Sequence, residues 1–443
     1  MEITTVRTSG LGDSTFVLVH DGQAIVVDPQ RDIDRFLSVL EPTGAELRYV
    51  LETHIHNDYV SGGKELAAAT GAEIVLPAAG AVKFDHLPAF HKEPIECGDW
   101  SVVPIHTPGH TPEHLSYLVV VEGEPVAVFS GGSLLVGSAG RPDLLGMDRA
   151  RTLAHLQYIS VNRLAALPDD VGLYPTHGAG SFCTATVAGA HTSTVGQERL
   201  TNPVLQYPDL ESFISGQLAG LQPFPRYYAF MGPTNLAGPA PLPDVSLPEL
   251  AVGDIGSTTV VDIRPAERFA AGHLPGSVGI PFGDQVGVWA GWVLPFDSEI
   301  VLVADRQQDV AEVHRQFTRI GFDRVIGVVF ELPDQDSLAS YEAVRLPEFL
   351  RRLRDGDIKQ VIDVRAPDEW EAGHIDGSIY SYVPDLYDNT GVVDPNRTAW
   401  LVCGTGHRGT IAAAALERDG LRPGVLVGHG VSEVMARGSG VLN

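Results

Sequence analysis

The sequence is poor in basic residues and contains no long apolar run. Its 30 lysines and arginines stand against 56 aspartates and glutamates, so the net charge at pH 7 is −26. A chain of this charge repels phosphate backbones and anionic lipid headgroups, which argues against nucleic acid and membrane surfaces as partners. The longest apolar stretches, such as residues 118–121, end at charges or glycines. None approaches the ~20 residues that a membrane-spanning helix needs.

Cysteine is also scarce, with Cys97, Cys183 and Cys403 as the complete set. An odd and sparse set does not build a disulfide framework and is typical of a reducing compartment. A secretory signal has a basic segment followed by an apolar run. The first ten residues do not have this pattern. We therefore expect a cytoplasmic protein.

A length of 443 residues predicts two to four domains. Residues 14–28 alternate around Asp21-Gly22 and predict a β-hairpin. Apolar strands and helical segments then alternate to about Tyr174, which is typical of a layered α/β domain. Residues 232–250 contain five prolines and no long apolar run, so we expect a linker there.

A tandem repeat follows this proline-rich segment. Val260–Pro265 (VVDIRP) is echoed by Val361–Ala366 (VIDVRA), and Phe269–Gly276 (FAAGHLPG) is echoed by Trp370–Gly377 (WEAGHIDG). Each copy continues into a second apolar strand, a polar loop and a helix. The repeat predicts two copies of one small α/β unit with a parallel sheet, over residues 251–340 and 345–443.

Histidines gather in loops that follow apolar strands of the N-terminal region. Thr-His-Ile-His-Asn-Asp carries His54, His56 and Asp58; His-Thr-Pro-Gly-His carries His110; and Tyr-Pro-Thr-His carries His177. Imidazole and carboxylate groups at this spacing converge readily on a divalent metal. Packing does not explain four histidines at strand ends, so the set predicts a metal site.

These elements resemble the metallo-β-lactamase superfamily over residues 1–231, which implies an αββα sandwich. THIHNDYVSGG, HTPGHTPEH, GRPDLLG and YPTHGAG are most similar to its persulfide dioxygenase branch. That resemblance implies one iron bound by two histidines and an aspartate, and the oxidation of a persulfide to sulfite by O₂. Mononuclear Fe(II) is therefore the expected cofactor, with zinc as the alternative.

Two positions depart from the family pattern. Tyr59 stands where hydrolases with two zinc ions carry a histidine for the second metal. Gly132, in Phe-Ser-Gly-Gly-Ser, stands where the family carries its metal-binding aspartate. Because glycine has no side chain, the two-histidine-one-carboxylate triad is incomplete. The expected metal ligands are therefore His54, His56 and His110, and the residues expected beside them or at a second metal are Asp58 and His177.

Cys183 follows the last of these histidines by six residues. A free cysteine is usually a small core residue. A thiol close to the metal also suits a role as accessory carrier of a persulfide, and the sequence leaves both interpretations open.

The last repeat places Cys403 at the start of a loop between an apolar strand and a helix beginning near Ile411. Loop N–H groups and a helix N-terminus stabilise a thiolate or a persulfide. Arg408 adds charge for an anionic sulfur donor. With the DVR and GHIDGS elements upstream, the segment 345–443 resembles the rhodanese family, which implies Cys403 as the sulfur-carrying nucleophile and Arg408 as its catalytic partner.

The first repeat lacks this cysteine. Its strand leads to Ala304-Asp305-Arg306, and Asp305 is expected at the nucleophile position. A carboxylate does not carry sulfane sulfur, so we expect the copy over 251–340 to be inactive and to act as a scaffold or to present a surface between the outer domains.

The leading prediction is a persulfide dioxygenase joined to a sulfurtransferase. Its expected substrates are a low-molecular-weight thiol persulfide (of glutathione, coenzyme A or a similar thiol), thiosulfate and sulfite. One alternative is a zinc-dependent thioester hydrolase of the glyoxalase II type. Another is a sulfurtransferase with a degenerate metal domain. The metal, the physiological thiol and the oligomeric state, a homo-oligomer included, stay open.

Overall fold

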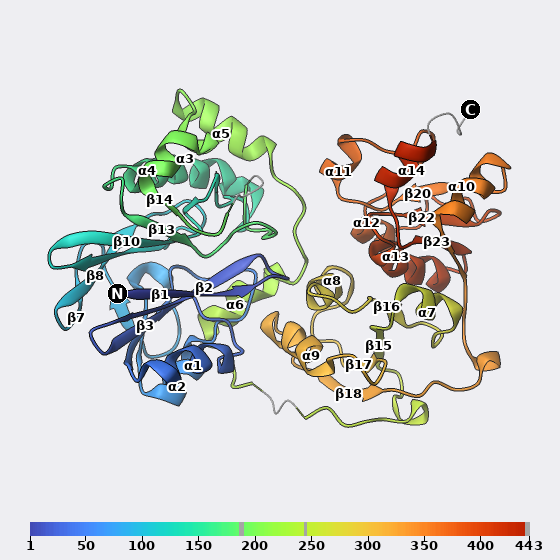
Figure 1. Ribbon diagram of the computed structural model, residues 1–443, viewed down its shortest axis with the longest axis horizontal. Helices are drawn as coiled ribbons and strands as arrows, with labels where there is room; N and C mark the ends of the chain where they lie inside the picture. Colours follow the sequence, from blue (N-terminus) through green and yellow to red (C-terminus); the bar gives the residue numbers. More distant parts are fainter. Residues whose placement is uncertain (186–189, 243–245, 439–443) are drawn as a thin grey trace. The chain divides into compact units, whose positions relative to one another are not determined.

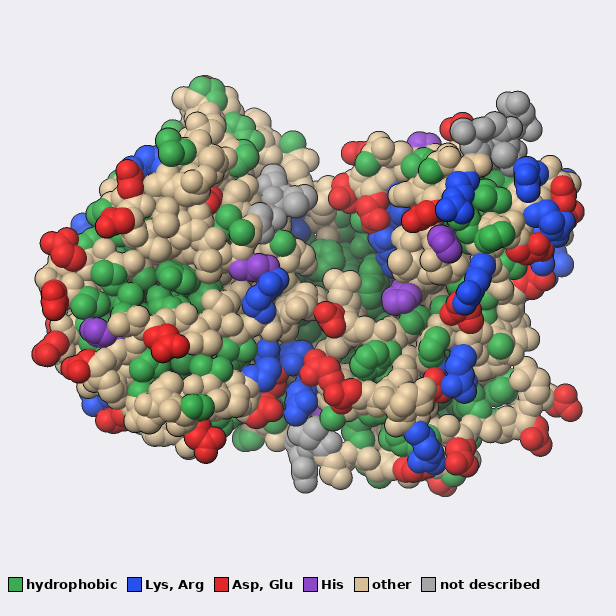
Figure 2. Space-filling model, in the orientation of Figure 1, with side chains coloured by type: hydrophobic (Ala, Val, Ile, Leu, Met, Phe, Trp, Pro, Cys, Tyr) green, Lys and Arg blue, Asp and Glu red, His purple; other side chains and the backbone are tan. Residues whose placement is uncertain are grey.

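A computed structural model describes residues 1–185, 190–242 and 246–438. It divides into two compact units, one of residues 1–243 with 318–321 and one of residues 244–317 with 322–443. Among the described residues, no helix is both long and apolar enough to span a membrane. Acidic side chains are spread over the visible face of the protein rather than gathered in one patch (Figure 2).

The first unit contains two mixed six-stranded sheets (Figure 1). The first sheet consists, in spatial order, of β1 (Glu2–Thr8), β2 (Asp13–His20), β3 (Gln23–Val27), β4 (Glu46–Leu51), β5 (Glu73–Pro77) and β6 (Leu87–Ala89). The second consists of β14 (Ser193–Thr194), β13 (Gly172–Pro175), β10 (Glu124–Gly131), β9 (Leu115–Val121), β8 (Trp100–His106) and β7 (Ile95–Cys97). A short ribbon of β11 (Leu134–Leu135) and β12 (Ser138–Ala139) follows β10.

Helices cover the outer face of each sheet, which gives the predicted αββα order (Figure 1). The helices of this unit are α1 (Asp34–Leu40), α2 (Gly63–Thr70), α3 (Met147–Ala165), α4 (Val195–Thr201), α5 (Leu210–Ala219) and α6 (Tyr228–Ala237). Strand alternation explains the layers, because successive side chains point to opposite faces of a sheet. Phe16 of β2 packs between the sheets, whereas Val17 packs with Leu40 of α1 and Leu66 of α2.

The predicted hairpin is confirmed, with β2 and β3 paired antiparallel and Asp21 at a φ of 50° in the turn. The expected linker needs a correction at its start. Helix α6 runs to Ala237, so residues 232–237 are helical, and Asn235 is buried. Proline 233 does not prevent this helix. Residues 243–245 of that segment, and 439–443 of the last repeat, lie outside the described residues.

The second unit contains two parallel sheets (Figure 1). The first has four strands, β16 (Val278–Gly279), β15 (Thr259–Asp262), β17 (Ile300–Val303) and β18 (Val325–Val329). The second has five strands, β19 (Glu342–Arg345), β23 (Pro423–Val427), β22 (Ala399–Val402), β20 (Val361–Asp363) and β21 (Ile379–Tyr380). Their helices are α7 (Ala266–Ala271), α8 (Val286–Val293), α9 (Val310–Arg319), α10 (Leu346–Arg354), α11 (Pro367–Glu371), α12 (Val383–Asp388), α13 (His407–Arg418) and α14 (Val431–Gly438).

The sequence repeat is a structural repeat. In the first copy, the β15–β17 ladder pairs Asp262 with Val303, and in the second the β20–β22 ladder pairs Asp363 with Val402. Most strands of both sheets are apolar and buried. This is typical of parallel sheets, because the helices that connect parallel strands cover both faces of the sheet. The predicted fold class, an αββα sandwich followed by two small α/β units with parallel sheets, is thus confirmed.

Candidate functional site

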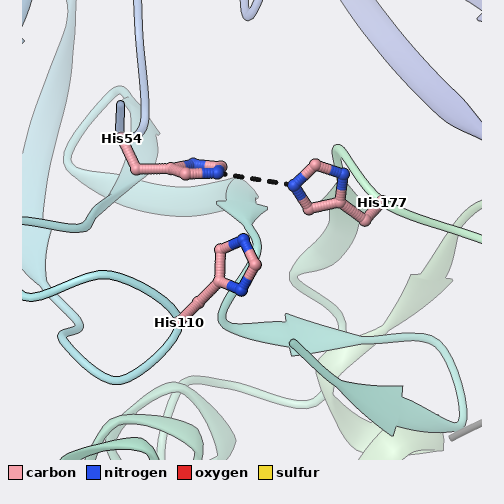
Figure 3. A group of neighbouring side chains, drawn as sticks. All are labelled: His54, His110 and His177. Carbon is pink, nitrogen blue, oxygen red and sulfur yellow. Dashed lines mark hydrogen bonds between the residues drawn. The ribbon is translucent and has the colours of Figure 1, made fainter. Parts of the chain in front are cut away.

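Three buried imidazoles converge at the ends of strands in the first unit (Figure 3). His54 follows β4, His110 lies between β8 and β9, and His177 follows β13. Each offers a ring nitrogen, and the three nitrogens lie within 4.8 Å of one another. The Nε2 atoms of His54 and His177 are 3.4 Å apart. The strand ends therefore bring together residues that are more than 120 positions apart in the sequence.

The Nδ1 atom of each ring already has a partner. His110 Nδ1 donates to the carbonyl oxygen of Arg141 at 2.9 Å, and His177 Nδ1 donates to Asp13 at 2.8 Å. His54 Nδ1 lies 2.8 Å from the hydroxyl of Thr53, which itself donates to Asp28. A hydrogen on every Nδ1 leaves every Nε2 with a free lone pair.

The three rings are suited to a cation. Burial and the neighbouring histidines hold the pKa of His54 and of His110 well below the usual range, and burial lowers the pKa of His177. Neutral imidazole is the form that binds metals. His110 Nε2 is buried and makes no hydrogen bond to any described residue. Lone pairs that face one another at this range fit a divalent metal between them, so the donor set fits the predicted metal.

His56 has a different environment from the one its spacing predicts. Its Nε2 lies 3.2 Å from Asp28, 3.3 Å from Glu52 and 3.0 Å from the hydroxyl of Tyr59. Burial alone would lower the pKa of His56, but Asp28 and Glu52 outweigh burial and hold this pKa well above the usual range. Two acidic groups therefore face the His56 ring. The structure brings His177 to His54 and His110, and it also groups His56 with Asp28 and His54, and with Asp58 and His177. His56 as a metal ligand stays a prediction.

The ring of His110 occupies the space that a side chain at position 132 would need. A Cβ atom added to Gly132 would lie 2.2 Å from the His110 ring. The Gly132 N–H donates to His114 Nε2 at 2.9 Å, so the backbone is also fixed there. The absence of the family aspartate is thus matched by the packing of a histidine in its place.

Several residues that support these loops carry no signal in the sequence. Asn235 of α6 donates to the carbonyl oxygens of His56 and Tyr59 at 2.9 and 2.8 Å, and the Tyr227 hydroxyl donates to the carbonyl oxygen of Asp58. Asn235 belongs to the segment expected as a linker, so its role was missed. Asp13, Asp28 and Glu52 were also missed, although each adjoins a buried strand.

Asp58 and Cys183 lie beside the cluster. Burial, and then the nearby Asp13 carboxylate, raise the pKa of Asp58 to about 7, and its Oδ2 lies 3.3 Å from His177 Nδ1. Burial, followed by Asp58, raises the pKa of the Cys183 thiol well above its usual range. Its Sγ atom lies 3.9 Å from the Tyr228 hydroxyl. A fully buried thiol of high pKa is a poor nucleophile, which favours the interpretation of Cys183 as a core residue.

A second candidate site is the loop from Cys403 to Gly406 in the second unit. The Gly406 N–H points at Cys403 Sγ with a separation of 3.1 Å. Gly406 has a φ of 101°, and a Cβ there would lie 2.9 Å from the Leu426 carbonyl oxygen. The turn that aims this N–H therefore requires glycine. Helix α13 starts at His407, earlier than the expected Ile411, so its N-terminus directly follows the thiol loop.

Arg408 does not stand free for a sulfur donor. Both terminal nitrogens of its guanidinium donate to Glu369 of α11, one of them at 2.8 Å. Glu369 also accepts from the Ala366 N–H at 3.1 Å. Burial alone would raise the pKa of Glu369, but Arg408 outweighs burial and lowers that pKa. The pair leaves the loop with less positive charge than the sequence suggests.

The corresponding loop of the first repeat begins at Ala304. Because the ladders match Val303 with Val402, Ala304 and not Asp305 follows the strand as Cys403 does. Asp305 is one residue further on, and its Oδ1 lies 2.5 Å from Arg268. The expectation for Asp305 is corrected by one residue. Neither residue has a thiol.

Comparison with known families and proteins agrees with both units. Residues 9–177 match the Metallo-beta-lactamase superfamily, and residues 249–329 and 346–435 each match the Rhodanese-like domain. The chain carries one metallo-β-lactamase domain and two rhodanese-like domains. The sequence prediction of this arrangement is confirmed, and the exact domain boundaries stay predictions.

Individual relatives cover parts of the chain. A hydroxyacylglutathione hydrolase of Methylobacillus flagellatus is 30% identical over 177 residues, which are 37% of this chain and 62% of that protein. The chain thus spans about three fifths of the length of the curated relatives it matches. A metallo-beta-lactamase crystal structure from Staphylococcus aureus subsp. aureus COL is 28% identical with a TM-score of 0.70, covering 75% of this chain and 99% of that one. ETHE1 from Myxococcus xanthus is 26% identical with a TM-score of 0.47, covering 54% and 99%.

Because the match to the Staphylococcus aureus structure covers 75% of this chain, it extends past the metallo-β-lactamase domain, which matches over residues 9–177. The fold similarity therefore includes part of the rhodanese-like region.

Proposed function

We propose that the chain is an enzyme of sulfur metabolism that oxidises a thiol persulfide in its metallo-β-lactamase domain and transfers sulfane sulfur at Cys403. The observation that carries the first half is the convergence of three Nε2 lone pairs, two of them 3.4 Å apart, in a buried site. The observation that supports the second half is the N–H of Gly406 aimed at Cys403 Sγ.

The proposed ligands are His54, His110 and His177. This set replaces the one expected from spacing, because Asp28 and Glu52 hold the His56 ring. Three neutral ligands would leave the charge of a divalent metal uncompensated, which would suit an anionic sulfur substrate. Iron would supply the redox chemistry, and zinc would supply Lewis acidity. The roles of Asp13, Thr53 and the Arg141 carbonyl are to fix each ring through Nδ1.

The overall oxidation balances without a further reductant. One thiol persulfide, one O₂ and one water give one thiol, one sulfite and two protons. The outer sulfur loses four electrons, and O₂ accepts four. Asp58 and Asp13, whose pKa values burial raises to about 7, lie next to His177 and are suited to receive protons.

Sulfur transfer at Cys403 needs only a thiolate and a sulfane donor. The Cys403 sulfur attacks the outer sulfur of the donor, a new S–S bond forms, and the donor thiol leaves. Sulfite then attacks the outer sulfur of the Cys403 persulfide, which gives thiosulfate and restores the thiolate. The Gly406 N–H and the start of α13 stabilise the anions.

Oxygen consumption tests the metal half. Iron-loaded protein is expected to consume O₂ with glutathione persulfide or with the persulfide of an uncharged thiol, and His54→Ala and His177→Gln are expected to lose both bound iron and uptake. His155→Gln, which changes an exposed histidine of the same domain, is the control. Full uptake by His54→Ala would refute the oxygenase. If His56→Gln loses bound iron and O₂ uptake while His177→Gln keeps both, the third ligand is His56.

A second candidate is a zinc-dependent thioester hydrolase. The similarity to hydroxyacylglutathione hydrolases at 30% identity favours it. Tyr59, which occupies the place of a second-metal histidine, and Gly132 count against it. Hydrolysis of lactoylglutathione by zinc-loaded protein, lost in His110→Ala, would support this candidate. Purified protein with no stoichiometric transition metal would instead favour a sulfurtransferase with a degenerate metal domain.

A further inference from the structure

A cavity of about 480 Å³ lies beside the histidine loops of the metallo-β-lactamase domain. Ile55 and Asn57 line it from the His54 loop, Thr111 and Glu113 line it from the His110 loop, and Tyr228 lines it from α6. Its volume is in the range of sites for small organic ligands. The cavity adjoins the loops that carry His54 and His110, which makes it a candidate place for the thiol part of a substrate.

The charge of this cavity is unusual for a site that takes an acidic thiol. No lysine, arginine or histidine is among the described residues that line it, and its one charged group is Glu113. The Glu113 Oε1 accepts from the Ile55 N–H at 2.9 Å, which fixes the carboxylate in the wall. An anion that enters loses hydration and finds no opposite charge, so binding of anionic ligands is disfavoured.

The polar groups of the wall are neutral. The Thr111 side chain is 1% exposed, and its hydroxyl makes no hydrogen bond within the described part of the chain. Asn57 adds an amide and Tyr228 a hydroxyl. A buried hydroxyl without a partner is costly, and a ligand hydroxyl or amide would satisfy it. The remaining lining is mostly aliphatic, with Leu145 at the exposed side.

We infer that the substrate of this site is the persulfide of an uncharged low-molecular-weight thiol that carries hydroxyl or amide groups. This inference rests on the proposed function and narrows its substrate. Glutathione carries two carboxylates and one ammonium, and coenzyme A carries several phosphate charges. The cavity disfavours both, and coenzyme A more strongly.

Calorimetric titration of the full chain with unreactive S-methyl thioethers tests the preference. The three probes are the S-methyl derivatives of N-acetylcysteine amide, glutathione and coenzyme A. We expect the uncharged amide to bind about 10-fold more tightly than the glutathione derivative, and the coenzyme A derivative to bind more weakly still. Equal or tighter binding of either anionic probe overturns the inference, and so does the absence of binding by all three.

A charge placed in the cavity sharpens the test. Leu145 lines the cavity and is 37% exposed, so Leu145→Lys adds a cation there without burying it. We expect this variant to bind S-methylglutathione about 5-fold more tightly and the uncharged probe unchanged. Leu200→Lys adds the same charge on α4 at a residue that is 78% exposed and does not line the cavity. An equal gain in both variants would mean a general charge effect and overturn the inference.

Binding and turnover fail separately in this design. The S-methyl probes need neither O₂ nor a bond-breaking step. If the uncharged probe binds more tightly but no persulfide supports O₂ uptake, the proposed dioxygenase activity is refuted and the proposed ligand preference of the cavity is supported. If O₂ uptake occurs and is most efficient with glutathione persulfide, the proposed dioxygenase activity is supported and the proposed ligand preference of the cavity is refuted.

Discussion

Both rhodanese-like domains have the same buried ion pair after their first strand, between an arginine and the aspartate two residues before it; we call this pair the clasp. In the first, Arg264 pairs with Asp262 and donates to the Gly272 carbonyl oxygen at 2.8 Å; in the second, Arg365 pairs with Asp363 and donates to Gly373 at 2.7 Å. The arginine fixes the turn after the first strand against the end of the following helix. The framework of the domain has thus been kept in both copies.

The loops at the carboxyl ends of the strands differ in charge. Six residues after the clasp aspartate, the second domain carries Glu369, which pairs with Arg408 beyond the thiol loop. The first domain carries Arg268 at the same position, and it pairs with Asp305 within the loop. The two copies thus carry opposite charges at this equivalent position. Their partners are not equivalent, because Asp305 directly follows Ala304, whereas Arg408 lies five residues after Cys403.

The largest expected effect distinguishes the two loops directly. Cys403→Ser is expected to reduce thiosulfate-to-cyanide sulfur transfer by at least about 1000-fold, because a hydroxyl at this position does not carry sulfane sulfur. The assay is the formation of thiocyanate by the full chain. An unchanged rate would contradict the assignment of Cys403. Ala304→Cys in the Cys403→Ser background is the matched test of the other loop, and we expect it to remain inactive.

The two clasps are expected to contribute equally to the free energy of unfolding. Arg365→Met leaves the Asp363 carboxylate, which is fully buried, without its partner, and should lower the free energy of unfolding by about 3 kcal/mol. Arg264→Met should cost a similar amount, because Asp262 is equally buried. Denaturant titration measures both. Arg351→Met removes an exposed ion pair on α10 and is expected to leave stability unchanged. A clasp effect no larger than this control would mean that the repeat does not depend on the clasp.

The Glu369–Arg408 pair should set the choice of donor. Glu369→Gln removes the charge that neutralises Arg408, so kcat/KM for the thiosulfate dianion should rise about 10-fold relative to kcat/KM for a thiol persulfide. Glu371→Gln changes the same charge at an exposed position of α11 and should leave the ratio unchanged. A parallel loss with both donors would instead assign Glu369 a purely structural role.

The pH dependence of the same pair has a definite sign. The pKa of Glu369 is lowered in the folded protein, because Arg408 outweighs the effect of burial. Its contribution to stability is therefore complete above the unfolded pKa and is lost as the pH falls through the folded pKa. Acidification below the usual glutamate range should thus raise the donor ratio of the unmodified protein towards that of Glu369→Gln. If the ratio of kcat/KM for thiosulfate to kcat/KM for a thiol persulfide does not change on acidification, the Glu369–Arg408 pair does not set the choice of donor.

The sequence predicted the elements of both sites but not all the contacts that their side chains make. The strand ends and the spacing of the histidine motifs were sufficient to gather His54, His110 and His177 in one region. Spacing did not predict the contacts of His56 with Asp28, which lies 28 residues earlier, and with Glu52, which directly follows the same strand, β4. The contact with Asp28 depends on the tertiary fold.

The same reason explains what the sequence did not show in the rhodanese-like domains. The apolar run of β17 continues into Ala304, so the sequence does not mark where the strand ends, and the ladder with β15 is needed to identify the residue equivalent to Cys403. The role of Arg408 in holding a donor stays a prediction, and its ion pair with Glu369, 39 residues away, was not expected. Apolar periodicity predicts elements well, whereas the pairing of charges across elements depends on the tertiary fold.

The smallest expected effect concerns the contact between the two copies. His273 of the first domain stacks on Phe269 and lies 2.9 Å from Glu417 of α13, the helix that follows the thiol loop. Its counterpart His374 stacks on Trp370 in the same way but is exposed. The first domain therefore covers a helix that positions Cys403.

If this contact makes the first domain a scaffold, Glu417→Ala should lower the rate of sulfur transfer about 2-fold and the free energy of unfolding by less than about 1 kcal/mol. Glu417→Gln, which keeps a hydrogen-bonding group, should retain the wild-type rate. Steady-state transfer and denaturant titration measure the two effects. A loss of stability without a change in rate would show that the first domain supports the fold of α13 but not the reaction at Cys403. An unchanged rate and stability would leave the two copies joined without coupling through His273.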